Sequence, residues 1–156
     1  MMPDRVVQYF EFDHTFRTIW TDGRKLPADP PEPHWLGWNV GHWEGNTFVI
    51  ESNGYDERSW LNSSNPDGGY PHSDQMKITE RYTRTNYGTL EAQMTIDDAK
   101  ALTKPWVATK RYRRLPAGTR VYDYGCSENN RNPITEAGQT LTLGTDGKPI
   151  DRIIKK

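Results

Sequence analysis

The chain has 156 residues, with 20 basic and 21 acidic side chains and a formal net charge of −1 at pH 7. This balance excludes the strongly basic surface of a nucleic-acid-binding domain, and no apolar run approaches the length of a membrane-spanning helix, so neither nucleic acid nor membrane is an expected partner. Hydrophobic residues make up only 33%, but the aromatic content of 12%, with 6 Trp and 8 Tyr, is too high for a disordered chain and predicts a single domain over 1–156.

The first predicted element is a β-hairpin. Apolar and polar residues alternate in 5–12 and in 15–20, and the pair Asp13-His14 between these runs is a turn signal. The following stretch 26–33, "LPADPPEP", is rich in proline, which cannot donate a hydrogen bond to a β-ladder. It therefore predicts an extended loop that crosses to the next strand.

A second hairpin follows this loop. The alternating runs 36–44 and 47–55 are joined by Gly45-Asn46, a strong signal for a two-residue turn. The polar, glycine-containing stretch 56–73 is then predicted to be a long loop, the kind of segment that often carries functional residues.

The third hairpin consists of 75–85 and 89–97, with its turn at 86–88. An Asp-Asp pair at its end is typical of a helix cap and predicts one helical turn over 99–102.

The last part of the chain predicts two more hairpins. The runs 105–115 and 119–126 flank the turn "PAG", and a final hairpin is expected over 140–154. The region 131–156 as a whole is expected to be a loosely packed C-terminal extension or hairpin.

Together these elements predict an all-β protein. Some eight to ten short strands joined mostly by hairpins favour an antiparallel meander that closes into a barrel or half-barrel. The alternative is a two-sheet β-sandwich.

Four sequence blocks resemble a family of small, bacterial, often exported β-rich proteins to which no single activity is assigned. The blocks are "GHWEGNTFVIES", "PHSDQMKITERYTR", "TIDDAKALTKPW" and "YDYGCSENN", and the match covers 6–130. Asn46 and Ala99 depart from the family pattern, which has Asp and Pro there. The resemblance implies a lipocalin-like fold and a periplasmic or secreted location. The N-terminus shows no signal-peptide apolar region, so the chain as written is expected to be cytoplasmic.

An ionisable residue falls on the apolar side of each of three predicted strands, and these residues are His42, Glu80 and Lys110. If all three strands turn that side to the barrel interior, the residues form a polar cluster among aromatic side chains. The aromatic side chains on the same sides are Trp38, Tyr82, Trp106 and Tyr112. Glu80 is then a candidate general acid or base, with Lys110 stabilising negative charge and the aromatic residues and His42 contacting a ligand. The alternative is a buried ion pair that fixes the sheet register.

Two further candidates lie in the long loop. His72 could act as the proton-transfer partner of Glu80, or be a turn residue beside Ser73 and Asp74. Trp60 is either a ring that stacks on a ligand or an anchor that holds the loop on the barrel.

No motif predicts a metal or a cofactor. The four histidines lack metal-ligand spacing, and Cys126 is the only cysteine. No dinucleotide or phosphate-binding glycine motif is present, so any chemistry is expected to be cofactor-free. The basic run 110–114 is interpreted as a solvated strand face.

Three functional hypotheses follow. In the first, the barrel binds a small apolar or aromatic molecule and acts as a cofactor-independent lyase, isomerase or hydratase through Glu80 and His72. In the second, it is a non-catalytic module that binds an apolar ligand or a carbohydrate. In the third, it is a structural or interaction domain with a filled core. A homodimer is compatible with each of them.

Overall fold

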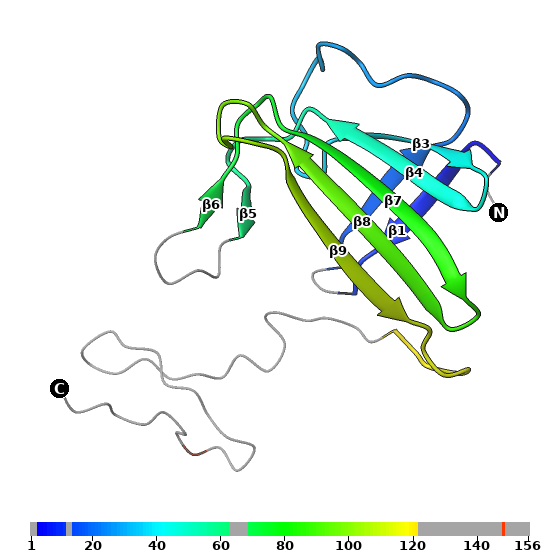
Figure 1. The fold of residues 1–156 in the computed structure, drawn as a ribbon. Helices are drawn as coiled ribbons and strands as arrows, with labels where there is room; N and C mark the ends of the chain where they lie inside the picture. Colours follow the sequence, from blue (N-terminus) through cyan, green and yellow to red (C-terminus); the bar gives the residue numbers. More distant parts are fainter. Residues whose placement is uncertain (1–2, 12–13, 63–68, 122–147, 149–156) are drawn as a thin grey trace.

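The computed structural model describes residues 3–11, 14–62, 69–121 and 148. Within these ranges it contains strands and no helix (Figure 1). The strands are β1 (Arg5–Tyr9), β2 (Phe16–Trp20), β3 (Trp38–Glu44), β4 (Thr47–Asn53), β5 (Trp60–Asn62), β6 (Tyr70–Pro71), β7 (Lys77–Asn86), β8 (Thr89–Asp97) and β9 (Trp106–Arg113).

Seven of the strands form one sheet in the order β1-β2-β3-β4-β7-β8-β9, and this sheet curls through 188° into an open half-barrel (Figure 1). The prediction of an all-β half-barrel is thereby confirmed, and the described strands do not form the alternative sandwich of two facing sheets. The strands β5 and β6 pair separately as a small second sheet.

The sheet is mixed and not purely antiparallel. β2 and β3 are parallel neighbours, and they are joined in register at a single residue pair, Trp20 with Val40. The proline-containing loop between them carries the chain back before β3 starts, as a parallel connection requires. The sequence predicted this crossing loop but not the parallel pairing that results from it.

The three predicted hairpins in the described ranges are present. β1–β2, β3–β4 and β7–β8 are antiparallel neighbours, and β9 adds antiparallel to β8. Gly45, in the β3–β4 turn, has a φ of 57°, which favours glycine over residues with a side chain. The predicted second strand over 119–126, the extension 131–156 and the hairpin over 140–154 fall largely or wholly outside the described residues.

One local prediction differs from the structure and one agrees with it. The expected long loop 56–73 contains the short β5–β6 pair, in which Trp60 lies opposite Pro71. The expected helical turn over 99–102 is present as a single turn, in which the Leu102 backbone N–H donates a 2.8 Å hydrogen bond to the Asp98 carbonyl oxygen. Asp98 caps it, because the backbone N–H groups of Lys100 and Ala101 donate to its carboxylate.

One face of the curled sheet carries an apolar cluster formed by Ile19, Phe48 and Ile50, with Tyr82 packed against it. Gly41 makes this packing possible, because a Cβ there would lie 2.6 Å from the Phe48 ring and 2.8 Å from Ile19. A second cluster lies further along the sheet. It contains Tyr55, Met76 and Ile96, with Leu61, Ile78, Met94 and Leu102 around them.

Candidate functional site

The inner face of the half-barrel contains a hollow of about 390 Å³, which we call the inner hollow. Its walls come from β1, β2, β3, β4, β7 and β8 and from the β3–β4 turn. The lining residues are Val6, Val7, Gln8, Ile19, Trp43, Asn46, Phe48, Ile50, Tyr82, Arg84 and Leu90. Because residues of β1 and of β8, from opposite parts of the sheet, line the same hollow, this face is the concave one.

Glu80 lies on this concave face and is only 4% exposed. The register places it directly between Ile50 on β4 and Met94 on β8. One carboxylate oxygen accepts a hydrogen bond from the Arg17 guanidinium, and the other accepts a 2.8 Å hydrogen bond from the Tyr82 hydroxyl. The strand alternation predicted the burial of Glu80 correctly, and its charge is balanced by an ion pair.

Arg17 reaches Glu80 from β2, across the width of β3 and β4. Its Nε donates a 2.7 Å hydrogen bond to the side-chain oxygen of Gln8, its partner on β1. Gln8 and Tyr82 both line the inner hollow, and each bonds one member of the ion pair. These four side chains, Gln8, Arg17, Glu80 and Tyr82, form what we call the inner polar network.

The Tyr82 hydroxyl is a donor within this network at neutral pH. Burial and the adjacent Glu80 carboxylate raise the pKa of Tyr82 well above its ordinary value, and Gln8 offsets part of this shift. Tyr82 therefore keeps its proton and donates a hydrogen bond to the Glu80 carboxylate.

Tyr55, a member of the second core cluster, carries a buried hydroxyl. Burial raises the pKa of Tyr55, and the Arg17 guanidinium offsets part of this shift. In the part of the chain that the structure describes, the Tyr55 hydroxyl has no hydrogen-bond partner. It is a polar group whose burial is left uncompensated.

His72 does not join Glu80. Its Nε2 lies 2.7 Å from the Ser59 hydroxyl and its Nδ1 lies 3.0 Å from the Ser73 carbonyl oxygen, so both ring nitrogens are engaged. The ring meets Tyr55 edge-on at 6.1 Å between centroids. The structure therefore does not bring the His72 ring into hydrogen-bond contact with Glu80.

His42 and Lys110 are also separate from Glu80. The register aligns Gly41, and not His42, with Ile50 and Glu80, so His42 lies on the opposite face, where its Nε2 is 3.2 Å from Glu44. The prediction failed because alternation shows which residues share a face but not which face points inward. Lys110 does lie on the Glu80 face but is exposed, with its Nζ 5.1 Å from the Tyr112 ring centroid.

The predicted aromatic ligand contacts are dispersed. Tyr82 alone among them lines the inner hollow. Trp60 is 53% exposed on the small second sheet, and Trp106 is exposed at the start of β9. Tyr112 lies near the outer end of the sheet, in a separate hollow described below.

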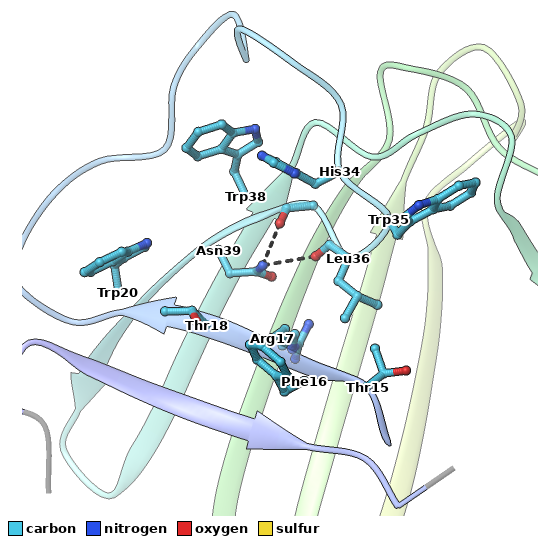
Figure 2. A pocket seen from close by; sticks show the side chains of 11 residues that line it. Thr15, Phe16, Arg17, Thr18, Trp20, His34, Trp35, Leu36, Trp38 and Asn39 are labelled. Carbon is cyan, nitrogen blue, oxygen red and sulfur yellow. Dashed lines mark hydrogen bonds between the residues drawn. The ribbon is translucent and has the colours of Figure 1, made fainter. Parts of the chain in front are cut away.

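Trp38 lines an aromatic cleft of about 440 Å³ between β2 and the loop that precedes β3 (Figure 2). The tryptophan rings around this cleft already have partners within the chain. Arg5 and Arg24 lie over the Trp20 ring at 4.1 and 3.6 Å, and the Trp38 Nε1 donates to the Glu32 carbonyl. The cleft is therefore a weaker candidate for a binding site than the inner hollow.

The sequence interpretation missed Arg17 and Gln8. Arg17 alternates with Ile19 on β2 and so carried the same signal as Glu80, a charged residue on the side of a buried aliphatic one. The signal was obscured because the other side of β2 carries the large apolar residues Phe16 and Trp20. The sequence alone therefore does not show which side of β2 faces inward.

Within the described ranges, no group of three or more His, Cys, Asp or Glu side chains is arranged to hold a metal ion. The same part of the chain has no helix long and apolar enough to cross a membrane. No protein-family model, curated protein or solved structure gave a match to the chain. The functional argument therefore rests on the geometry of the inner face.

Proposed function

We propose that the half-barrel binds one small, largely apolar molecule in the inner hollow, as a ligand-binding protein. One observation carries this proposal. The hollow is lined by the apolar side chains of Ile19, Phe48 and Ile50, and also by the polar groups of Gln8 and Tyr82. Such a combination of apolar lining with a few fixed polar groups is typical of small-molecule sites, and its volume falls within their usual range of about 300–1,000 Å³.

The exposed apolar side chains around the hollow support this role. Trp43 is 67% exposed, and Val6 and Leu90 also leave much of their surface open to water. A contiguous apolar surface of this kind on a concave face costs stability unless something covers it. A bound apolar ligand would cover it and gain the corresponding hydrophobic free energy.

The inner polar network argues for binding over catalysis. Both carboxylate oxygens of Glu80 already accept hydrogen bonds, one from Arg17 and one from Tyr82. A general base needs an oxygen that is free to approach the proton of a substrate. The network is better suited to hold the polar groups of Gln8 and Tyr82 in place on the wall of the hollow. There they would bind a hydroxyl, carbonyl or amide group of the ligand.

The proposal is tested by fluorescence titration with the neutral apolar dye N-phenylnaphthylamine, followed through the emission of the dye itself. We expect saturable binding by the folded protein. Val6→Trp, which places a large ring at the edge of the inner hollow, should weaken binding about tenfold or more, because the ring takes up part of the space that the dye would occupy.

Val107→Trp is the matched control. Val107 is an exposed valine on the other edge strand, β9, and does not line the inner hollow. Its substitution should leave the affinity for the dye unchanged. The proposal fails if the wild-type protein shows no saturable binding, or if the two variants bind the dye equally well.

A further inference from the structure

We infer that the ligand of the inner hollow is an anionic amphiphile, whose negatively charged head group binds two arginines, Arg84 and Arg114, at the outer end of the hollow. This inference rests on the proposed function and specifies its ligand class. Arg84 and Arg114 are called the arginine cluster below. They come from the end of β7 and from the residue after β9, whereas Arg113 pairs with Thr89 and lies on the opposite face of the sheet.

The arginine cluster surrounds the β7–β8 turn. The Arg114 backbone N–H donates a 2.8 Å hydrogen bond to the Gly88 carbonyl, which holds the end of β9 against this turn. The Cζ atoms of Arg84 and Arg114 lie 5.2 and 4.5 Å from the centroid of the Tyr87 ring. A hollow of about 340 Å³ lies among these groups. The residues that line it are Arg84, Tyr87, Gly88, Thr89, Leu90, Tyr112, Arg113 and Arg114.

The charge of this hollow is uncompensated. None of its lining residues is acidic, and within the described residues no carboxylate lies at ion-pair distance from Arg84, Arg113 or Arg114. Six other arginines each have a carboxylate partner. These pairs are Arg5–Asp4, Arg17–Glu80, Arg24–Asp22, Arg58–Asp56, Arg81–Glu44 and Arg111–Glu91.

Arg84 is held in place by neutral acceptors. Its guanidinium donates to the carbonyl oxygens of Asn86 and Tyr87 at 3.3 and 2.9 Å. These bonds orient the group without neutralising its charge. A guanidinium fixed in this way can still bind an anion, and its planar donors match a carboxylate, sulfate or phosphate oxygen pair.

The arginine cluster is continuous with the inner hollow, because Arg84 and Leu90 line both hollows. Tyr82 and Arg84 lie on the same face of β7, two residues apart, which corresponds to about 7 Å along the strand. An apolar group beside Ile50 and Tyr82 can therefore extend past Leu90 to an anionic group at Arg84. The structure offers one elongated site with an apolar inner part and a cationic outer end.

Arginines on β9 also have a simpler role, since positive charges on an edge strand discourage pairing with another chain. That role explains Arg113 as a residue of the edge strand. It does not explain why Arg84, from the interior strand β7, lies with Arg114 around one tyrosine ring beside the apolar hollow.

The test compares two dyes with the same apolar body, neutral N-phenylnaphthylamine and its sulfonated counterpart anilinonaphthalene sulfonate. We expect the sulfonated dye to bind about tenfold more tightly at low ionic strength, and this advantage to shrink with added salt because the cluster is exposed. Arg114→Gln, at a residue that does not line the inner hollow, should remove most of the advantage and leave the affinity for the neutral dye unchanged, which also shows that the variant is folded.

Arg111→Gln is the control. Arg111 lies on the same strand but is paired with Glu91 and does not line either hollow, so its substitution should leave both affinities unchanged. If both dyes bind equally, or if Arg114→Gln binds the sulfonated dye as tightly as wild type does, the inference is overturned while the proposed function stands. If neither dye binds, the proposed function itself fails. If the sulfonated dye binds through the arginines but is unaffected by Val6→Trp, the anion site is separate from the inner hollow and the amphiphile is excluded.

Discussion

At the scale of single residues, the central feature is a buried charge pair that the fold must keep together. Arg17 and Glu80 side chains are 10% and 5% exposed, so each has lost most of its hydration. A buried pair of this kind is a weak net contributor to stability when intact, but removing one partner leaves a charge without compensation.

We therefore expect Glu80→Gln to lower the free energy of unfolding by on the order of 3–5 kcal/mol, because Arg17 would remain buried and charged. The double variant Arg17→Met, Glu80→Leu should lose much less, since two apolar side chains replace the pair. Denaturant unfolding near neutral pH measures these losses, together with those of the single variants Arg17→Met and Glu80→Leu. A double variant whose loss equals the sum of these two single losses would show that the residues are not coupled.

The same residues show what alternation in the sequence can and cannot reveal. Glu80 was identified because Ile78 and Tyr82 on either side of it are clearly apolar. Its partner Arg17 comes from β2, 63 positions away in the sequence, and the contact depends on the curl of the whole sheet. The burial of a residue follows from local pattern, but the identity of its partner requires the tertiary structure.

At the scale of elements, the hairpins were predictable because turn residues and alternation are local signals. Gly45-Asn46 and the β7–β8 turn each lie between strands that pair in register. The parallel pairing of β2 with β3 was not predictable in this way, because a long proline-rich loop does not specify where its two ends meet. The short β5–β6 pair was missed because Pro71 and the polar residues around it are typical of loops.

The turn after β8 has a clear residue-level cause that can be tested. Asp98 is buried, and its carboxylate accepts hydrogen bonds from the backbone and hydroxyl of Ser73, which fix the start of the β7 segment to this turn. Burial alone would raise the pKa of Asp98, but these bonds, with those from the Ala101 and Lys100 backbone, outweigh it and lower the pKa.

A lowered pKa in the folded state means that the Asp98 carboxylate stabilises the fold above its ordinary pKa of about 3.9, and that this contribution is lost as the pH falls through its folded-state pKa. Asp98→Asn should thus cost about 1–3 kcal/mol near neutral pH, and the difference from wild type should narrow below about pH 4. Urea unfolding of the wild-type protein and of Asp98→Asn, from neutral pH to below about pH 4, measures this difference in the free energy of unfolding. A difference that stays constant with pH would mean that the charge of Asp98 does not contribute.

At the scale of the whole molecule, the half-barrel is not uniformly connected. β4 and β7 lie in the middle of the sheet and pair along six residue positions with each other, in addition to their outer neighbours. The β1–β2 hairpin, in contrast, joins β3 through one residue pair, Trp20 with Val40. Its remaining described links to the sheet include the packing of Ile19 and the Arg17–Glu80 ion pair.

This unequal connection predicts that the β1–β2 hairpin opens locally before the protein unfolds as a whole. Its backbone amides should exchange with solvent faster than those of β4 and β7, because few cross-strand hydrogen bonds hold it to β3. Arg17→Met should accelerate exchange in β1 and β2 selectively, since it removes the ion pair that joins the hairpin to β7. Hydrogen exchange followed by mass spectrometry on both proteins tests this.

The inner hollow makes the same experiment informative about function, because its walls include Val6 and Gln8 on β1 and Ile19 on β2 as well as Phe48 on β4. A ligand there contacts both the loosely joined hairpin and the firmly paired centre of the sheet. Binding should therefore slow exchange most in β1 and β2, where local opening competes with binding. Slowing confined to β4 and β7, with β1 and β2 unchanged, would mean that the ligand does not bridge the two parts of the half-barrel.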